Sequence, residues 1–372
     1  VPDTVIKSML NSDWIEAHRS RQLNPEKPVL RGTSQGSDVF FQSREAVNSH
    51  YDACPNLVQQ TMDRFSELTG RSYNIFEYIG DPNAKQVIIA MASATETIEE
   101  TIHHLNANGA EVGLIKVRLF RPFSTKHLMA ALPKTCLSIG VLDRTKEPGS
   151  SGEPLYLDVL QFVMEAMQQD HFDMLPKVVG GRYGLSSKDF TPEMVVAIIE
   201  NLKLKQPKPN FTVGIVDDIT HLNLEHAFHI QLQDQYYQAL FYETKDNTSK
   251  IRFDALIQLI GDAPDTFIQG YVECGYNKSN STQISHLRVA SEKIKAPYLI
   301  DSANFIACDF HSFEREFSIL KKIKNKGTLL VTTELGVNQF WKSISEEKQI
   351  ILRAKDVSCL LYTSPSPRDG LL

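Results

Sequence analysis

The sequence predicts an α/β protein built as two consecutive three-layer domains, each with a mostly parallel sheet between helices. Short apolar runs of strand length alternate with segments whose apolar residues recur at helical spacing, and this alternation implies right-handed crossovers between parallel strands. A run with two prolines and three lysines, residues 203–211 (KLKQPKPNF), separates two such patterns and has the composition of a stiff, solvated linker. We therefore expect two α/β units, one after the other.

The first pattern is clearest between residues 85 and 152. Strands are predicted at residues 87–91 (VIIAM), 112–119 (VGLIKVRL) and 137–142 (LSIGVL). Ile98, Ile102 and Leu105 recur at helical spacing between the first two strands, and residues 125–132 fit a short helix before the third. Ligands and partners usually meet a parallel sheet at the carboxyl ends of its strands. Those ends carry residues 93–97, residues 118–123 and the charged loop that begins at Asp143.

Both patterns extend beyond these strands. In the first we expect helices at residues 155–167 and from Thr191-Pro192 onward, and a fourth strand at residues 177–179. In the second we expect strands at residues 236–241, 267–272, 298–300 and 328–332, and helices at residues 253–260 and 317–324. The predicted divisions are a connector from a missing preceding domain (1–28), two domains (29–205 and 206–357), and an unstructured tail of sequencing origin (358–372).

Composition excludes several classes of protein. The 372 residues carry a formal net charge of −6, which gives a nucleic-acid partner no electrostatic support. No apolar run reaches the roughly 18 to 20 residues that a membrane helix needs. The cysteines stand too far apart for a metal site, an iron–sulfur cluster or a disulfide framework: Cys54, Cys136, Cys274, Cys308 and Cys359. We expect a reducing intracellular location, the cytoplasm, with a mitochondrion-related organelle as the alternative.

Candidate site residues lie in two loops of the first domain, and each set has a structural alternative. Arg31, Gly32 and Thr33 either contact another domain or form an ordinary entry loop. Four charged residues follow the third strand: Asp143, Arg144, Lys146 and Glu147. They either pair with a partner domain or satisfy one another. The pair His103-His104 points in different directions on a helix, which favours a solvated face over a metal site. No catalytic residue is assigned.

Several motifs, taken in order, resemble one known family. They are residues 31–35 (RGTSQ), 38–42 (DVFFQ), 68–73 (LTGRSY), 116–123 (KVRLFRPF), 142–149 (LDRTKEPG), 181–185 (GRYGL), 211–215 (FTVGI), Asp217-Asp218 and 285–288 (SHLR). In this order they closely resemble the pyruvate:ferredoxin (flavodoxin) oxidoreductase family. The resemblance covers roughly residues 10–335.

The resemblance implies a fold, an activity and partners. Residues 29–205 would be a Rossmann-like domain similar to the transketolase C-terminal domain, and residues 206–357 a partial, divergent gamma-like domain. The family's full-length enzyme converts pyruvate and coenzyme A to acetyl-CoA and carbon dioxide. It uses thiamine diphosphate and iron–sulfur clusters, and passes electrons to ferredoxin or flavodoxin.

The chain lacks the domains that bind thiamine and the clusters, so we expect the fragment alone to hold none of these cofactors and to be inactive. Its part in the enzyme would be structural and adjacent to coenzyme A. The expected partners are the other domains of the same polypeptide, the electron acceptor, and a second copy in a full-length homodimer. Neither nucleic acid nor a membrane is expected.

Two segments of the second domain depart from the family pattern. Residues 243–250 (ETKDNTSK) replace a glycine-rich run, and residues 277–281 (NKSNS) keep one lysine, Lys278, of a usual pair. The family uses this region near coenzyme A, so Lys278 is the candidate contact to a coenzyme A phosphate. His286 and Arg288 either line the same pocket or form a structural pair. The missing glycines also favour an alternative function, a non-catalytic scaffold domain of a eukaryotic sulfite reductase component.

Overall fold

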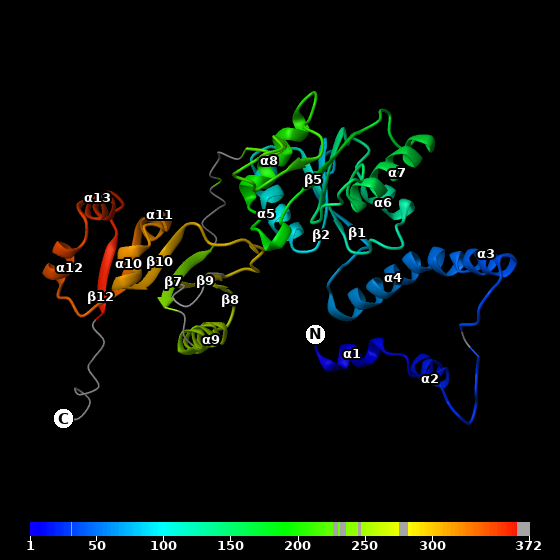
Figure 1. Cartoon of the computed structure of the whole chain (residues 1–372), viewed down its shortest axis with the longest axis horizontal. Helices are drawn as coiled ribbons and strands as arrows, with labels where there is room; N and C mark the ends of the chain where they lie inside the picture. Colours follow the sequence, from blue (N-terminus) through cyan, green and yellow to red (C-terminus); the bar gives the residue numbers. More distant parts are fainter. Residues whose placement is uncertain (31, 226–229, 231–235, 245–246, 275–281, 363–372) are drawn as a thin grey trace. The chain divides into compact units, whose positions relative to one another are not determined.

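The computed structural model describes residues 1–30, 32–225, 230, 236–244, 247–274 and 282–362. The chain forms two compact units, Val1–Phe228 and His229–Leu372, which we name the first unit and the second unit. Each unit has its own six-stranded sheet, and most neighbouring strands in both are parallel (Figure 1). The predicted fold class, two consecutive and mostly parallel α/β sheets with helices, is confirmed.

The sheet of the first unit has the strand order β1-β3-β2-β4-β5-β6. Its strands are β1 (Phe76–Gly80), β2 (Gln86–Met91), β3 (Val112–Val117), β4 (Ser138–Asp143), β5 (Lys177–Arg182) and β6 (Phe211–Thr212). All are parallel except β1, which pairs antiparallel to β3 at one edge. The chain moves outward from β2 in both directions, so the topological switch point lies between β2 and β4. Ligands of open α/β sheets bind at such points, outside the carboxyl ends of the strands.

Helices cover both faces of this sheet. The cluster that contains Ile88 and Leu114 buries side chains of α5 (Ala94–Ala107) and α8 (Pro192–Lys203). The cluster on the opposite face, around Ile89, buries side chains of α6 (Thr125–Ala131) and α7 (Pro154–Gln168). Burial on both sides explains why β2, β3 and β4 read as continuous apolar runs in the sequence.

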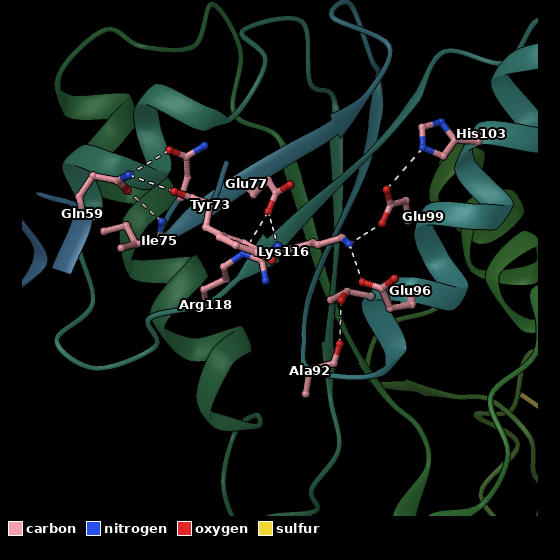
Figure 2. Close-up of polar contacts among 12 residues, drawn as sticks. Gln59, Tyr73, Ile75, Glu77, Ala92, Glu96, Glu99, His103, Lys116 and Arg118 are labelled. Carbon is pink, nitrogen blue, oxygen red and sulfur yellow. Dashed lines mark hydrogen bonds and ion pairs between the residues drawn. The ribbon is translucent and has the colours of Figure 1, made fainter. Parts of the chain in front are cut away.

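Four helices precede this sheet: α1 (Asp3–Met9), α2 (Ser12–Ser20), α3 (Ser37–Ala46) and α4 (Asn48–Thr69). None of the first three buries a side chain. Helix α4 does bury Pro55, and its partly buried Val58 and Met62 pack against the core of the first unit. Gln59 strengthens this attachment by accepting the backbone N–H of Ile75 at 3.1 Å (Figure 2). Helix α4 is therefore anchored to the core of the first unit by residues near its middle.

The sheet of the second unit has the strand order β12-β11-β10-β7-β9-β8. Its strands are β7 (Tyr237–Thr244), β8 (Phe267–Cys274), β9 (Thr282–Ala290), β10 (Ala303–Asp309), β11 (Ile323–Thr332) and β12 (Ser358–Tyr362). The four strands from β12 to β7 are parallel, and β9 runs antiparallel to both β7 and β8. Its helices are α9 (Asn247–Gly261), α10 (Phe310–Arg315), α11 (Ser318–Lys322), α12 (Val337–Ser343) and α13 (Glu346–Ala354).

Three expectations for the second unit are corrected. Residues 298–300 form no strand; β10 follows them instead. Residues 358–362, assigned by composition to a tail, form β12, because the apolar run SCLLY pairs in parallel register with β11. The helix read at residues 317–324 is only the short α11, and β11 begins directly after it at Ile323. Tertiary pairing outweighed local composition in each case.

The first compact unit also extends past the predicted linker. Phe211 and Thr212 add a strand to β5, and Phe211, Val213 and Leu224 are buried in the core of the first unit. The structure therefore attaches residues 211–225 to the first unit, whereas the sequence placed the boundary after residue 205.

Candidate functional site

Asp143 lies at the carboxyl end of β4, beside the switch point of the first sheet. Its carboxylate accepts the backbone N–H groups of Leu155 at 3.0 Å and Tyr156 at 3.1 Å. These are free donors in the first turn of α7, so Asp143 caps a helix that begins eleven residues later at Pro154. The side chain is 3% exposed, and burial raises its pKa although the two backbone bonds oppose the shift. Asp143 therefore holds α7 against β4.

The rest of the charged loop also makes contacts inside the first unit. Arg144 donates to the Gly184 carbonyl at 2.8 Å and to the Ser187 hydroxyl at 3.3 Å. Gly184 and Ser187 both have positive φ, 64° and 60°, a conformation that costs energy for serine. Lys146 donates to the Glu147 carbonyl at 3.3 Å. Arg144 thus fixes the strained turn that follows β5.

Glu153 and Arg182 form an ion pair near the charged loop, and neither residue was predicted as a site residue from the sequence. Glu153 is 2% exposed, and its carboxylate lies 3.4 Å from Arg182 and 3.8 Å from Lys146. Arg182 also donates to the Asn210 carbonyl at 2.8 Å. The sequence pointed to Arg182 in part, since this residue belongs to the GRYGL motif. It could not identify the partners of Arg182, because they lie 28 and 29 residues away in the chain.

A buried lysine network occupies the α5 side of β3 (Figure 2). Lys116 is 5% exposed and points toward α5, where its amino group pairs with Glu99, also 5% exposed, and with Glu96 at 3.0 Å. Burial opposes the charged form, but the hydrogen bonds that Lys116 donates to Glu99 and Glu96 outweigh it and raise the pKa of Lys116. His103 is exposed and lies 3.6 Å from Glu99, which fits a solvated helix face. The neighbouring Arg118 pairs with Glu77.

This network explains part of the KVRLFRPF motif. Lys116 interrupts an otherwise apolar strand, and two glutamates three residues apart on α5 face it. The lysine and the two glutamates are visible in the sequence. The sequence did not show that they pair, because Glu99 and Glu96 lie 17 and 20 residues from Lys116 in the chain.

The entry loop that contains Gly32 and Thr33 lies at the surface. Gly32 and Thr33 are exposed, and Gly32 has a φ of 68° with no heavy atom within 4 Å of a Cβ built there. Arg31 lies outside the described residues. Contact of this loop with another domain stays a prediction.

In the second unit, the strands that precede the two departing segments end at the same edge of the sheet. Lys278, with the rest of residues 275–281, lies outside the described residues, as do residues 245–246. Their flanks are described, because Thr244 at the end of β7 pairs with Thr282, and Cys274 at the end of β8 pairs with Gln283. The altered glycine-rich run and the Lys278 segment therefore both connect to the carboxyl edge formed by β7 and β8.

Two buried polar side chains lie next to this edge on β9. Gln283 is 5% exposed and Ser285 is 1% exposed. Gln283, Ser285 and Leu287 are every second residue of β9, so their side chains share one face of the sheet. Leu287 packs with Phe253, which shows that this is the face that α9 covers. Gln283 Nε2 and Ser285 Oγ have no hydrogen-bond partner within the residues that the structure describes. Buried donors left in this way cost about 1–3 kcal/mol each and call for an explanation.

His286 and Arg288 point to the opposite face and bind the segment that leads to β10. His286 Nδ1 accepts the Ile300 backbone N–H at 3.1 Å, and its Nε2 lies 3.3 Å from Glu273. Arg288 donates to the Ala296 carbonyl and to Gln269, both at 3.0 Å, and stacks over Tyr298. Burial, with Lys322 and Arg288 nearby, lowers the pKa of His286 to about 3. These contacts also explain why residues 298–300 lie against the sheet without forming a strand.

The residues that the structure describes hold no group of three or more His, Cys, Asp or Glu side chains placed to bind a metal ion. Among them, no helix is both long enough and apolar enough to cross a membrane.

The chain is similar to proteins of known name. The family model for "Pyruvate:ferredoxin oxidoreductase core domain II" matches residues 84–193, the part that contains the Lys116 network and the Asp143 loop. Pyruvate-flavodoxin oxidoreductase from Trichormus variabilis is 45% identical over 352 residues, covering 94% of this chain and 29% of that protein. Pyruvate:ferredoxin oxidoreductase from Moorella thermoacetica is 46% identical over 324 residues, covering 86% of this chain and 27% of that protein.

A solved structure also matches, that of a pyruvate oxidoreductase subunit from Thermotoga maritima. It has a TM-score of 0.26 and 12% identity, and covers 37% of this chain and 66% of that chain. The chain spans less than a third of the length of the two oxidoreductases compared above. The resemblance that the motifs indicated is confirmed: over nearly its whole length, this chain is similar to a segment of pyruvate:ferredoxin and pyruvate-flavodoxin oxidoreductases.

Proposed function

We propose that the chain is one segment of a thiamine-dependent pyruvate:ferredoxin or pyruvate:flavodoxin oxidoreductase. The full enzyme would convert pyruvate and coenzyme A to acetyl-CoA and carbon dioxide and pass the electrons to ferredoxin or flavodoxin. The observation that carries this proposal is the 45% identity along 94% of the chain to a pyruvate-flavodoxin oxidoreductase. Thiamine diphosphate and the iron–sulfur clusters would be held by parts of the polypeptide outside this segment.

Within such an enzyme the first unit would be a scaffold. Its motif residues bind partners within the same unit: Asp143 caps α7, Arg144 fixes the turn after β5, and Lys116 ties β3 to α5. None of these side chains is left free to perform chemistry. On the resemblance, we assign the first unit from residue 29 onward to the transketolase C-terminal-like domain and the second unit to the gamma-like domain.

The second unit would lie next to coenzyme A. Gln283 and Ser285 fit a polar ligand, because each is buried and has a polar atom without a partner among the described residues. Both could donate a hydrogen bond to an amide or phosphate oxygen, and Lys278, which follows β8 in the sequence, could supply a positive charge. Coenzyme A, when bound, provides the thiol that accepts the acetyl group. The altered run at residues 243–250 leads us to expect weak binding by this chain alone.

The remaining proposals concern partners and location. The other domains of the same polypeptide are the nearest partners, with ferredoxin or flavodoxin as acceptor and a homodimer as the full-length assembly. We propose the cytoplasm or a mitochondrion-related organelle as the compartment. The sulfite reductase alternative has no support from the comparisons, which name pyruvate oxidoreductases.

The test is the full-length polypeptide encoded by the complete transcript. After cluster reconstitution, we expect it to reduce ferredoxin or flavodoxin in the presence of both pyruvate and coenzyme A. The present chain, purified alone, should show no such activity and no bound iron. A full-length protein that reduces sulfite, or that ignores pyruvate although its clusters are filled, would refute the proposal.

A further inference from the structure

The loop that follows β6 begins at the carboxyl edge of the first sheet. Two backbone hydrogen bonds of Thr212 close its neck: the N–H donates to the Leu222 carbonyl at 3.0 Å, and the carbonyl accepts the Leu224 N–H at 2.9 Å. Val213 and Leu224, at the two ends, are buried in the core of the first unit. We name residues 214–223 the β6 loop. It is firmly attached to the edge at which open α/β sheets usually meet ligands and partners.

Side chains fix the shape of the β6 loop from within. The Asp218 carboxylate accepts the backbone N–H of Thr220 at 3.1 Å and that of Asn223 at 2.8 Å. The Asn223 side chain accepts the Ile215 N–H at 3.2 Å, and Lys208 donates to the Asn223 carbonyl at 3.0 Å. Such bonds hold a turn in one conformation. One aspartate of the Asp217-Asp218 motif is therefore used to shape the loop.

The same loop presents two aliphatic side chains to water. Val216 is 96% exposed and Ile219 is 89% exposed, the two largest exposed fractions among the large apolar residues that the structure describes. Single exposed apolar side chains are ordinary. Here, however, a hydrogen-bonded loop holds both of them outside the core. A loop that is already ordered loses little conformational entropy on binding, which suits a docking element.

We propose that the β6 loop docks into an apolar pocket of another domain of the same full-length polypeptide. This inference rests on the proposed function only in taking the chain as a segment of a longer protein. Val216 and Ile219 fill the pocket, and Asp217 between them stays in water.

The small size of the apolar tip selects this occupant. Separate proteins that form a stable complex bury about 800 Å² on each partner, far more than two aliphatic side chains supply. A domain of the same polypeptide is held at high effective concentration, so a small contact is sufficient. Such domains are available, because this chain covers only 29% of the length of its Trichormus variabilis relative.

The first test compares this chain alone with the full-length polypeptide by carbene footprinting, in which a photolysed diazirine labels exposed residues. The peptide that contains the β6 loop should be labelled strongly in this chain alone. Its labelling should fall about fivefold in the full-length polypeptide, because docking removes both side chains from water. Weak labelling in this chain alone would show that the second unit covers the loop. Protection lost when a full-length assembly is diluted to monomers would assign the loop to a second copy. Either result would overturn the proposal.

The second test uses the double variant Val216→Asp/Ile219→Asp. Because both side chains are exposed, the variant should leave the melting temperature of this chain alone unchanged. In the full-length polypeptide it should restore labelling of the loop to the level of this chain alone and lower the melting temperature by several degrees. Asp217→Asn, in the same loop, is the matched control and should do neither.

Three results of the second test would refute docking by the apolar tip. They are an equal loss of stability in this chain alone, full protection of the loop despite the two aspartates, and an effect of Asp217→Asn as large as that of the double variant. None of these measurements requires enzymatic activity. A full-length protein that ignores pyruvate can therefore still show docking, and one that oxidises pyruvate can still fail to show it.

Discussion

The polar residues singled out in the two sheets differ in how they are satisfied. In the first unit, Asp143, Arg144 and Lys116 each bind partners from the same unit. In the second unit, His286 and Arg288 are satisfied in the same way, but Gln283 and Ser285 each keep a buried donor without a partner among the described residues. A motif residue can therefore be purely architectural, and the polar groups left over are the better guide to a ligand.

The strongest test of the architectural role in the first unit is Lys116→Met. Removing the ammonium leaves Glu99 charged and 5% exposed, so we expect the first unit to lose about 3–5 kcal/mol of stability. Urea unfolding followed by circular dichroism measures this loss. The double variant Lys116→Met/Glu99→Leu removes both charges and should recover most of it. If the single variant is as stable as the unaltered chain, the network contributes nothing and this side of the comparison is wrong.

The cap on α7 should contribute somewhat less. Asp143→Ala strands two backbone donors of α7, and we expect the same unfolding measurement to show a loss of about 2–3 kcal/mol. Asp217→Asn is the control, because Asp217 lies in the exposed turn after β6 and should change stability by less than about 0.5 kcal/mol. Equal effects of the two substitutions would show that Asp143 is an ordinary surface charge.

The second unit should respond to pH through His286. Its folded pKa, about 3, lies below the unfolded value of 6.5, so the unfolded chain binds the proton more readily between these two values. Stability is then complete above pH 6.5 and falls as the pH drops toward 3. We expect the second unit to be about 2 kcal/mol less stable at pH 5 than at pH 7.

Trp341 fluorescence reports this unit if Trp14 is replaced by Phe, because the chain has two tryptophans. His286→Asn can still accept the Ile300 N–H without titrating, and it should flatten the dependence on pH. An unchanged slope in that variant would assign the effect to another group.

The smallest expected effect on stability is that of Ser285→Ala. Because Ser285 Oγ is buried and has no partner among the described residues, its removal should not lower the free energy of unfolding and should raise it by about 1 kcal/mol at most, since the lost packing of the hydroxyl offsets part of the gain. If the hydroxyl contacts coenzyme A, the same substitution should weaken coenzyme A binding about tenfold by calorimetry. Lys278→Ala should weaken it similarly. Unaltered binding in both variants would separate the ligand from these residues.

The elements of the first sheet were largely predictable. Strands β2, β3 and β4 coincide closely with the predicted runs, because a strand buried on both faces leaves an unbroken apolar signal. β9 was not predicted, since buried polar residues such as Ser285, His286 and Arg288 hide the alternation of its faces. β12 was missed because five residues of apolar sequence become a strand only when β11 is available to pair with them.

The candidate site residues were also predictable from the sequence only in part. The sequence identified the loop after β4, since a polar run behind an apolar strand marks a carboxyl edge. It could not show that Asp143 caps α7, because that role depends on backbone donors 12 and 13 residues away.

Local order along this chain is therefore encoded by the period of its apolar residues, which acts between near neighbours. Whether a polar group is paired or left over depends on partners brought together by folding, as with Glu99 and Lys116 across 17 residues. The unpaired donors of Gln283 and Ser285 are recognisable only once β9 lies between β7 and β8 beneath α9. Hydrogen bonds act over about 3 Å of space, whatever the separation in sequence.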